Sequence, residues 1–509
     1  MMKHLLKTVS VLCLMATPTW AKNITPSEID KIVENAMDVF HVPGAAVGVI
    51  QDGKIIHSKG YGTRSLESGG DVDDDTYFGI ASNSKGFTAT ALAILVSDGK
   101  IKWTDRVKDH LPEFELSDPW VTDHFTIADL LSHATGLPLG SGDLMWWPDG
   151  NYPPEEIIRK MKYLKPNRDF RTTYAYNNMP FIIAGAIIPA VTGKSYEDFL
   201  NERIFTPLGM DRCTANTPMM ANDENIAEPH IRLDTTLKQV KRYLTIDEVA
   251  GSMAAAGIQC SLDDLLKWEQ MHLNNGAPLM DKETHATLWQ INTPMTVSEN
   301  NIKNGTKFRG YGLGYNISDY HGNRVVGHGG ALIGMYSNLT MLPEMDFAIA
   351  IVTNQQSGAA YNTIKNEILN AVLEIKNTKT AAETFKAQEA SRIKEKKRLA
   401  ELTGNGRPHL TLTEYAGRYH DKIWDGIEIS LNGDALYFKS DRSPTIRGKL
   451  EHFEENTFIA RWDHRDHEAD SYVMFNTNDN GEISGFTMKW ISNRTDFSYD
   501  FNTVDAIKQ

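Results

Sequence analysis

The chain has 509 residues, of which 41% are hydrophobic and 23% are charged. This composition excludes a disordered or fibrous protein, and the length is sufficient for a large core together with a second domain. The formal net charge of −14 disfavours nucleic acids and anionic membrane surfaces as partners.

Residues 1–21 have the pattern of a secretory signal peptide. Lys3 and Lys7 precede a short apolar run, "VSVLCLMA", and small residues precede the expected cleavage point. This run is too short to span a bilayer, and no later segment has about 18 unbroken apolar residues, so we predict no membrane span. Export predicts a periplasmic or secreted protein, in which Cys213 and Cys260 are able to form one disulfide. The sequence does not decide whether they pair.

Residues 22–376 predict one domain of mixed helices and strands. A helix over residues 27–40 has apolar residues at helical spacing. Two strands follow around Gly53, and two more lie far downstream around Pro343, before a helical run over residues 357–375. The segment between the two strand pairs is largely helical. We therefore expect one sheet built from both ends of this region, with a helical insertion.

The rest of the chain changes character twice. Residues 377–409 are rich in charged residues, as in "ETFKAQEASRIKEKKRLAE", and predict a solvated helical linker. Residues 410–505 show period-two alternation, with turn signals at Asn432-Gly433 and Asn480-Gly481. This last segment predicts a small antiparallel β domain.

The chain contains three Ser-x-x-Lys pairs: Ser82 with Lys85, Ser97 with Lys100, and Ser391 with Lys394. The third pair lies in the charged segment, and the second lies where a helix is about to end. Ser82 differs, because it follows the strand-like "TYFGIA" and precedes "GFTATALAILVSDG", an apolar helix that we expect to be buried. Three helical residues span about 300°, so Ser82 and Lys85 share one face of that helix.

This pair is chemically meaningful if Lys85 acts as a base. An unactivated hydroxyl is a poor nucleophile, and a serine hydrolase needs a base within hydrogen-bond reach together with donors for the oxyanion. Lysine acts as a base near neutrality only if burial or a positive neighbour lowers its pKa by about 3 units. A buried helix start provides such surroundings. A helix-capping serine beside a solvent-facing lysine is the alternative.

Two further stretches contain polar groups suited to the same chemistry. "TTYAYNNMPF" contains Tyr176, whose phenol can relay a proton, and Asn178, whose amide can orient the lysine and a substrate carbonyl. "VVGHGGALIG" contains His328 followed by Gly329 and Gly330 at the end of a predicted strand, where glycines let a ligand approach the backbone. A lone histidine is more often structural, but its position beside two glycines favours a functional site.

The chain resembles the penicillin-recognising serine hydrolases, a family of class C β-lactamases, DD-peptidases, D-aminopeptidases and related esterases. The resemblance covers about residues 27–375 and rests on three motifs in order: Ser82-x-x-Lys85, Tyr176-x-Asn178 and His328-x-Gly330. The flanking "LLSHATGLP", "IFTPLGM" and "GHGGALIGMYSNLTMLPE" are similar to this family as well. The resemblance implies an α+β fold of the β-lactamase/transpeptidase type: an antiparallel sheet flanked by helices beside an all-helical region, with the site in the cleft between them.

The resemblance also implies a role for each residue. Ser82 would be the acylated nucleophile, while Lys85 and Tyr176 would share the roles of base and proton relay, with the choice between them open. The backbone N–H groups of Ser82 and Ala331 would form the oxyanion hole. The substrate-binding residues would be Asn178, His328, Gly329, Gly330 and Ala331. No metal or organic cofactor is implied, and His133 in "LLSHATG" is interpreted as a structural loop residue.

One departure from the family bears on substrate choice. β-Lactamases and penicillin targets usually carry Lys-Thr-Gly where this chain has His328-Gly329-Gly330. A charged lysine favours a substrate carboxylate, whereas histidine, with an ordinary pKa near 6.5, is mostly neutral at pH 7. We therefore expect an exported hydrolase that cleaves amides or esters of short or D-amino-acid substrates through an acyl-Ser82 intermediate. The alternatives are a true class C-type β-lactamase or DD-carboxypeptidase, and a non-catalytic protein that binds peptidoglycan or peptides.

The C-terminal segment, which opens with "LTEYAGRYH", resembles the lipocalin-like β domains appended to some of these hydrolases. The resemblance implies a restriction on substrate size or a role in homo-oligomers. Within this segment, "DHRDHEAD" contains His464, Asp466 and His467 but lacks the first histidine of a metallo-β-lactamase zinc motif. We therefore predict no metal site there.

Overall fold

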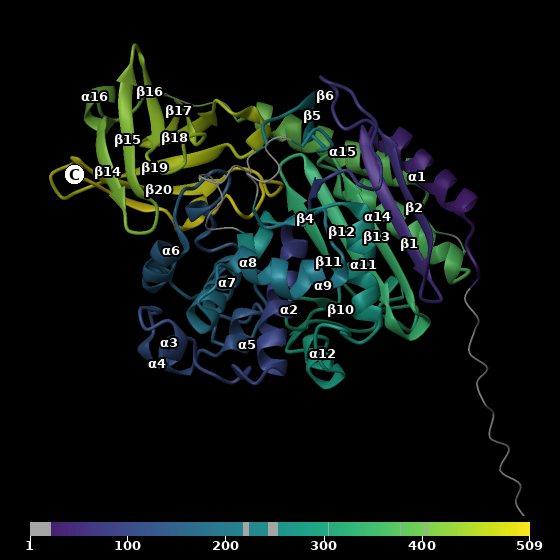
Figure 1. Cartoon of the computed structure of the whole chain (residues 1–509). Helices are drawn as coiled ribbons and strands as arrows, with labels where there is room; N and C mark the ends of the chain where they lie inside the picture. The colour runs from purple at the N-terminus through teal and green to yellow at the C-terminus, as the bar shows by residue number, and fades with distance from the viewer. Residues whose placement is uncertain are drawn as a thin grey trace, which may run out of the picture.

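The computed structural model describes residues 22–216, 223–242, 253–303, 305–376, 378–402, 404 and 406–509. The predicted signal peptide, residues 1–21, lies outside the described residues. Figure 1 shows a sheet covered by helices, a helical region beside it, and a barrel formed by the C-terminal segment. This is the α+β architecture expected from the sequence.

The central sheet brings together strands from both ends of its region. Its 8 strands are ordered β2 (Lys54–Gly62), β1 (Gly44–Gln51), β13 (Phe347–Thr353), β12 (Met335–Leu342), β11 (Asn323–Leu332), β10 (Asn316–Tyr320), β9 (Arg309–Tyr311) and β8 (Thr293–Met295). All neighbours are antiparallel. β1 pairs with β13 in a register that places Ala45 opposite Thr353. The two predicted strand pairs, β1–β2 and β12–β13, therefore join in one sheet.

Helices cover both faces of this sheet. On one face lie α1 (Pro26–Phe40), α14 (Gly358–Val372) and α15 (Ala381–Ala400). On the other face lies α11 (Leu262–Leu273), whose Leu266 is so close to β1 that a Cβ added at Gly48 would be 2.7 Å from it. Because both faces are covered, every residue of β1 is buried.

The helical region is built around α2 (Ser84–Ser97), which is buried from Ser84 to Leu95. The helices in this part of the chain are α3 (Val107–His110), α4 (Pro119–His124), α5 (Ile127–Leu130), α6 (Pro154–Lys160), α7 (Met179–Thr192), α8 (Tyr196–Leu200) and α9 (Thr206–Leu208). Further along the chain lie α12 (Lys282–Leu288), α13 (Glu299–Lys303) and the short hairpin of β5 (His230–Leu233) and β6 (Thr236–Gln239). The apolar run after Ser82 therefore forms a central buried helix.

Within the described residues, no single helix is long and apolar enough to cross a membrane. One pair of helices, Met179–Thr192 and Tyr196–Leu208, would together be long and apolar enough to cross a membrane by length and composition alone. The two helices of this pair are bent by 80° relative to each other.

The C-terminal segment folds into a closed antiparallel barrel, as Figure 1 shows in yellow-green. Its strands are β14 (Gly417–Asp421), β15 (Asp425–Asn432), β16 (Ala435–Ser440), β17 (Arg447–Glu454), β18 (Thr457–Trp462), β19 (Ser471–Thr477), β20 (Ile483–Trp490) and β21 (Asp505–Lys508). The barrel closes where β14 pairs with β21. Buried aromatic side chains, including Trp424, Phe438 and Trp462, fill the interior. The interior is thus a packed core, as is usual for barrels of this size.

The charged segment that precedes the barrel contains α15. Phe385 of this helix packs edge-to-face on Phe40 of α1, with ring centroids 5.6 Å apart. Glu389 accepts a hydrogen bond from the guanidinium of Arg232 at 2.9 Å. The helix is therefore docked on the sheet domain through Phe385 and through ion pairs such as that of Glu389 with Arg232, a contact that its charged composition did not reveal.

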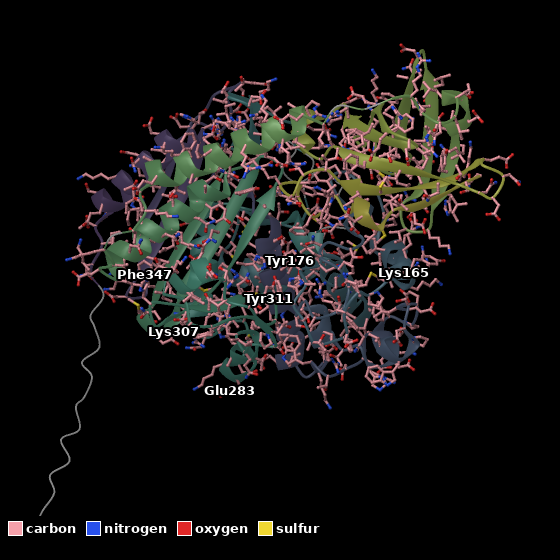
Figure 2. All side chains as sticks on the ribbon, turned by 180° about the vertical axis from the view of Figure 1, so that it is seen from behind. Lys165, Tyr176, Glu283, Lys307, Tyr311 and Phe347 are labelled. Atoms are coloured by element: carbon pink, nitrogen blue, oxygen red, sulfur yellow. A yellow bond between two sulfur atoms is a disulfide. The ribbon has the colours of Figure 1, made fainter. Side chains whose placement is uncertain are left out.

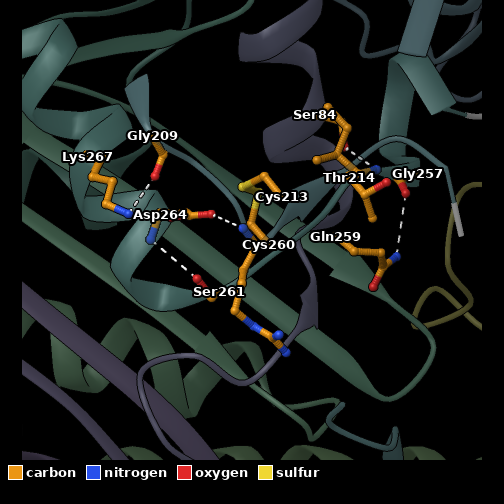
Figure 3. The surroundings of a disulfide bond; sticks show 12 residues. Ser84, Gly209, Cys213, Thr214, Gly257, Gln259, Cys260, Ser261, Asp264 and Lys267 are labelled. Atoms are coloured by element: carbon orange, nitrogen blue, oxygen red, sulfur yellow. Dashed lines mark hydrogen bonds and ion pairs between the residues drawn. A yellow bond between two sulfur atoms is a disulfide. The ribbon is translucent and has the colours of Figure 1, made fainter. Parts of the chain in front are cut away.

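A small three-stranded sheet lies directly before Ser82. It consists of β3 (Phe78–Gly79), β7 (Gln259–Cys260) and β4 (Cys213–Thr214). Cys213 and Cys260 lie opposite each other and form a disulfide across 47 residues, which Figure 3 shows with its surroundings. Next to β7, the N–H of Ile258 donates to Ser84 Oγ at 3.1 Å. The structure thus settles the pairing of the cysteines and places it behind the start of α2.

Removal of this disulfide is expected to destabilise the protein. A bridge that closes a loop of 47 residues restricts the unfolded chain and contributes about 4 kcal/mol in the chain-entropy model. We expect a double variant, Cys213→Ser with Cys260→Ser, to unfold at a clearly lower temperature in calorimetry. Wild type treated with a reductant should show the same loss. An unchanged unfolding temperature in both samples would contradict this prediction.

Candidate active site

Ser82 lies in a short 3-10 turn, η1 (Ala81–Asn83), between β3 and α2. Ala81 has a φ of 51°, a left-handed conformation that is unfavourable for a residue with a side chain and that is often found at functional sites. Ser337 of β12 holds the turn from outside. Its hydroxyl donates to Ile80 O at 2.6 Å and accepts from Asn83 Nδ2 at 2.8 Å. The sheet therefore fixes both sides of the turn, while Ser82 stays partly exposed.

Lys85 lies on the first turn of α2 and is completely buried. Its Nζ lies 3.2 Å from Ser82 Oγ, 2.6 Å from Asn178 Oδ1 and 2.9 Å from Ala255 O. Burial lowers the pKa of Lys85 to about 7, against the opposing effect of the Asp143 carboxylate. A substantial fraction of Lys85 is therefore neutral at neutral pH. The alternative of a solvent-facing lysine is wrong.

The three polar neighbours of Lys85 Nζ determine the direction of its lone pair when the amine is neutral. The oxygens of Asn178 and Ala255 can only accept hydrogen bonds, so they take the two N–H groups of the amine. The lone pair then faces the third neighbour, Ser82 Oγ. In this protonation state Ser82 donates its proton toward Lys85, which is the arrangement of a nucleophile and its base.

Asp143 continues this chain of contacts. Asn178 Nδ2 donates to Asp143 Oδ2 at 2.7 Å, which turns the amide oxygen of Asn178 toward Lys85. The same carboxylate oxygen accepts from Ser498 Oγ of the C-terminal segment at 2.8 Å. Asp143 is completely buried, and burial raises its pKa to about 7. Asp143 is thus a further member of the site.

Tyr176 lies over Lys85, with the Nζ atom 4.8 Å from the ring centroid; Figure 2 labels it near the middle of the molecule. Burial raises the pKa of Tyr176 well above 10, although the Ser82 hydroxyl opposes this effect. Tyr176 therefore remains a phenol at neutral pH, and of the two candidates Lys85 is the better base. The phenol oxygen is buried and, within the described part of the chain, its interaction with the Ser82 hydroxyl is the one polar contact found for it. It is available to a reacting group.

His328 is held in its neutral form. Its Nδ1 donates to Gly329 O at 2.6 Å, because a carbonyl can only accept. Its Nε2 therefore accepts from the Tyr311 hydroxyl at 3.0 Å. Burial, together with the charge of Lys85, lowers the pKa of His328 to about 3. This position thus lacks the fixed positive charge that a lysine would place there.

Strand β11 passes close to the turn that carries Ser82. A Cβ added at Gly330 would lie 2.2 Å from Ile80 O, a distance that no real side chain tolerates. A Cβ at Gly329 would meet no atom nearer than 3.4 Å. The glycine at position 330 is therefore what allows β11 to approach Ser82. Ala331, the next residue along, is exposed.

Substitution of Gly330 by alanine is expected to disturb both stability and the site. The added methyl group must push β11 away from the turn, and overpacking of this kind costs about 1–3 kcal/mol. We expect a lower unfolding temperature and slower reaction of Ser82 with a fluorophosphonate probe. Gly329→Ala is the matched control, since its methyl group makes only ordinary contacts. Equal behaviour of the two variants would contradict the close approach of β11.

The structure brings the candidate residues to one place. The rings of Tyr176 and His328 lie 6.0 Å apart. His133, interpreted as structural, is completely buried, and its ring lies 4.2 Å from that of Tyr176. The residues that meet around Lys85 and β11 are Ser82, Lys85, Tyr176, Asn178, His328, Gly329 and Gly330, with Ala331 following on the same strand.

Sequence reasoning missed Asp143, Tyr311, Ser337 and the carbonyl of Ala255. The only signal for Asp143 was an acidic residue in an otherwise apolar, tryptophan-rich loop, "GSGDLMWWPDG". In that loop Trp146 and Trp147 are buried, and Trp147 packs on Tyr499 of the C-terminal segment at 6.0 Å. Trp147 thus lies at the contact with the C-terminal segment, whereas Trp146 Nε1 donates to Asp143 Oδ1 at 3.3 Å.

The histidine cluster of the barrel is compact. One ligand atom from each of His464, Asp466 and His467 lies within 4.8 Å of the others. His464 Nδ1 lies 3.7 Å from Asp466 Oδ1, a distance that also suits an ion pair. The expectation of no metal at this position stays a prediction.

A Ser-x-x-Lys pair with a buried lysine beneath a tyrosine, at the junction of an antiparallel sheet and a helical region, defines a hydrolase of the β-lactamase fold. Residues 29–374 match the family model described as Beta-lactamase, and the chain belongs to this family. Residues 403–506, which include the barrel, match a domain of unknown function, DUF3471.

Several known proteins are similar to this chain. The unguisins hydrolase ungD' of Aspergillus campestris is 29% identical over 338 residues, which cover 65% of this chain and 62% of that protein. Protein flp of Staphylococcus aureus is 25% identical over 342 residues, covering 66% and 64% respectively. The chain thus spans less than two thirds of these curated relatives. The structure of an octameric penicillin-binding protein homologue from Pyrococcus abyssi matches with a TM-score of 0.61 and 23% identity, covering 95% of this chain and 99% of that chain. This last similarity concerns the fold alone.

Proposed function

We propose that the protein is an exported serine hydrolase that cleaves amide or ester bonds through an acyl-Ser82 intermediate. The contacts of Lys85 are the main support for this proposal. Lys85 is a completely buried amine whose two acceptor neighbours leave its lone pair facing Ser82 Oγ at 3.2 Å. Such a lysine activates a serine without help from a histidine.

The reaction then follows from the positions of the side chains. Ser82 Oγ attacks the substrate carbonyl while its proton passes to Lys85 Nζ, and backbone N–H groups of Ser82 and Ala331 stabilise the oxyanion. Collapse of the intermediate breaks the bond to the leaving group, which takes a proton from the Tyr176 phenol. Lys85 returns its proton to Tyr176. Water hydrolyses the acyl-enzyme by the reverse proton path, which releases the acid and restores Ser82.

The neutral state of His328 supports a particular substrate class. With a pKa of about 3, this side chain gives no charge with which to bind a substrate carboxylate. A relative that is named an unguisins hydrolase supports hydrolysis by the shared domain. We therefore propose amides or esters of short or D-amino-acid substrates ahead of β-lactams.

The location and assembly of the protein are part of the proposal. The N-terminal pattern supports export, and so does the disulfide, because disulfides persist in oxidising compartments. We propose a periplasmic or secreted protein. We further propose homo-oligomers formed through the barrel, since the similar structure from Pyrococcus abyssi is described as octameric.

A fluorophosphonate probe that reacts with activated serines tests the proposal. Peptide mapping by mass spectrometry should locate the adduct on Ser82 in wild type, and parallel assays with p-nitrophenyl esters, D- and L-aminoacyl anilides and nitrocefin should identify the acyl donor. Rapid turnover of nitrocefin would favour a β-lactamase. A folded protein that neither reacts nor turns over any substrate would favour a binding protein.

A further inference from the structure

The C-terminal segment reaches the active site through the connection between β20 and β21, residues 492–500, which we call the barrel arm. The ring of Phe497 packs edge-to-face on that of Tyr176, with centroids 5.6 Å apart. Asp500 Oδ2 accepts a hydrogen bond from the N–H of Gly142 at 2.7 Å. The barrel arm therefore contacts both a catalytic candidate and the loop that carries Asp143.

Ser498 connects the barrel arm to the catalytic groups. Its hydroxyl donates to Asp143 Oδ2, the atom that also accepts from Asn178 Nδ2. Asn178 Oδ1 in turn accepts from Lys85 Nζ, which lies 3.2 Å from Ser82 Oγ. The side chains of Ser498, Asp143, Asn178 and Lys85 are each at most 5% exposed. Water therefore does not compete for their hydrogen bonds.

A broad interface holds the barrel arm in place. Outside the arm, the barrel contacts α6 and the loop before it through three polar pairs: Arg442 with Glu156 at 3.0 Å, Asp425 with Lys160 at 2.6 Å, and the N–H of Thr445 with Asp149 Oδ2 at 3.0 Å. The position of Ser498 beside Asp143 thus follows from the docking of the whole barrel and does not depend on one flexible contact.

We propose that Ser498 is a positioning residue of the active site, which fixes Lys85 against Ser82 by way of Asp143 and Asn178. This inference rests on the proposed function. Without the Ser498 hydroxyl, the Asp143 carboxylate keeps only the donors Asn178 Nδ2 and Trp146 Nε1 among the described residues, and its orientation is less firmly fixed. A shift of Asp143 then weakens the contact with Asn178 Nδ2 that directs the amide oxygen of Asn178 toward Lys85. A domain outside the catalytic fold thereby sets the geometry of the base.

The same contacts link Ser498 to the pH dependence of the reaction. Burial raises the pKa of Asp143 and the Ser498 hydroxyl opposes this, while the Asp143 charge opposes the lowering of the Lys85 pKa by burial. Loss of the hydroxyl favours neutral Asp143 and so lowers the pKa of Lys85 further. The titratable groups that face the side chains of Asp143 and Lys85 are His133, Tyr176, His328 and Asp500.

The test compares Ser498→Ala and Ser498→Thr with Ser484→Ala, a control on the barrel whose hydroxyl donates to Asn476 O at 3.3 Å, far along the barrel strands from the barrel arm. We expect Ser498→Ala to lower kcat about tenfold, to leave KM nearly unchanged, and to move the acid limb of kcat/KM to lower pH. Ser498→Thr, which retains a hydroxyl, should restore most of kcat and the original limb. Ser484→Ala should match wild type.

A double-mutant cycle separates this role from general support of the fold. If Ser498 acts through Asp143, adding Ser498→Ala to Asp143→Asn should change kcat by less than about twofold. A wild-type kcat and pH profile in Ser498→Ala, an unmoved acid limb, or fully additive losses in the double variant would each overturn the inference. Failure of the proposed function would be seen separately, as a wild type that neither reacts with the probe nor turns over substrate, and the positioning role would fall with it.

Discussion

Replacement of Ser82 by alanine is expected to lower kcat/KM by about 10⁴-fold or more. Alanine lacks the oxygen that forms the acyl-enzyme, so the covalent route is lost entirely. The fold should be unaffected, because Ser82 is partly exposed and the turn around it is held by Ser337 and not by the Ser82 side chain. The measurement is kcat/KM with the best ester or anilide substrate, together with the unfolding temperature.

Ser391→Ala is the matched control, since Ser391 begins another Ser-x-x-Lys pair but is exposed on α15. This variant should retain full activity. Turnover by Ser82→Ala close to that of wild type would show that another group is the nucleophile. It would also remove the basis for the roles of Lys85 and Tyr176.

Replacement of Lys85 by methionine is expected to lower kcat about 10³-fold, within the range usual for loss of a general base. Wild-type activity should rise with pH through about 7, because burial lowers the pKa of Lys85 to about 7 and only the neutral amine accepts a proton. The variant should lose this acid limb. Lys100→Met, at the exposed lysine of the second Ser-x-x-Lys pair, is the control and should behave as wild type.

Lys85→Met should also make the protein more stable near neutral pH. The pKa of Lys85 is lower in the folded state than its unfolded value of about 10.4, so the unfolded chain binds more protons between these values. Burial of the charged amine therefore lowers the free energy of unfolding. This loss of stability is fully present below the pKa of Lys85 in the folded state and disappears as pH rises past its pKa in the unfolded state. The gain in unfolding temperature should therefore be largest below about pH 7 and absent near pH 10. A gain in unfolding temperature that did not depend on pH would contradict the conclusion that burial lowers the pKa of Lys85.

The sequence was most informative where a pattern is local. Period-two and helical spacing predicted α1, α14 and both strand pairs of the sheet, because each element shows one face to the core. Ser82, Lys85, Tyr176 and Asn178 were found through short motifs whose spacing places them on a helix start or a turn. These signals do not depend on the rest of the fold.

The parts that were missed depend on contacts between distant segments. Asp143 becomes a site residue only because Asn178 and Ser498 lie beside it, and neither neighbour is near it in sequence. Ala255 contributes a backbone oxygen, which its residue type cannot indicate. The docking of α15 depends on Phe385 and on the pairing of Glu389 with Arg232, and both partners lie far from α15 in sequence. In each case the role of the residue follows from its neighbours in the fold and not from its own type or local sequence.

The pairing of β1 with β13 has a consequence for how the polypeptide is made. Ala45 finds its partner only when Thr353 has been synthesised, and Gly44 N–H similarly waits for Asn354. Until then the growing chain carries a hairpin with an apolar, unpaired edge, which invites aggregation. Contacts of such sequence separation also fold slowly. We therefore expect the chain to require delayed folding, or protection of this edge, until β13 is available to pair with β1.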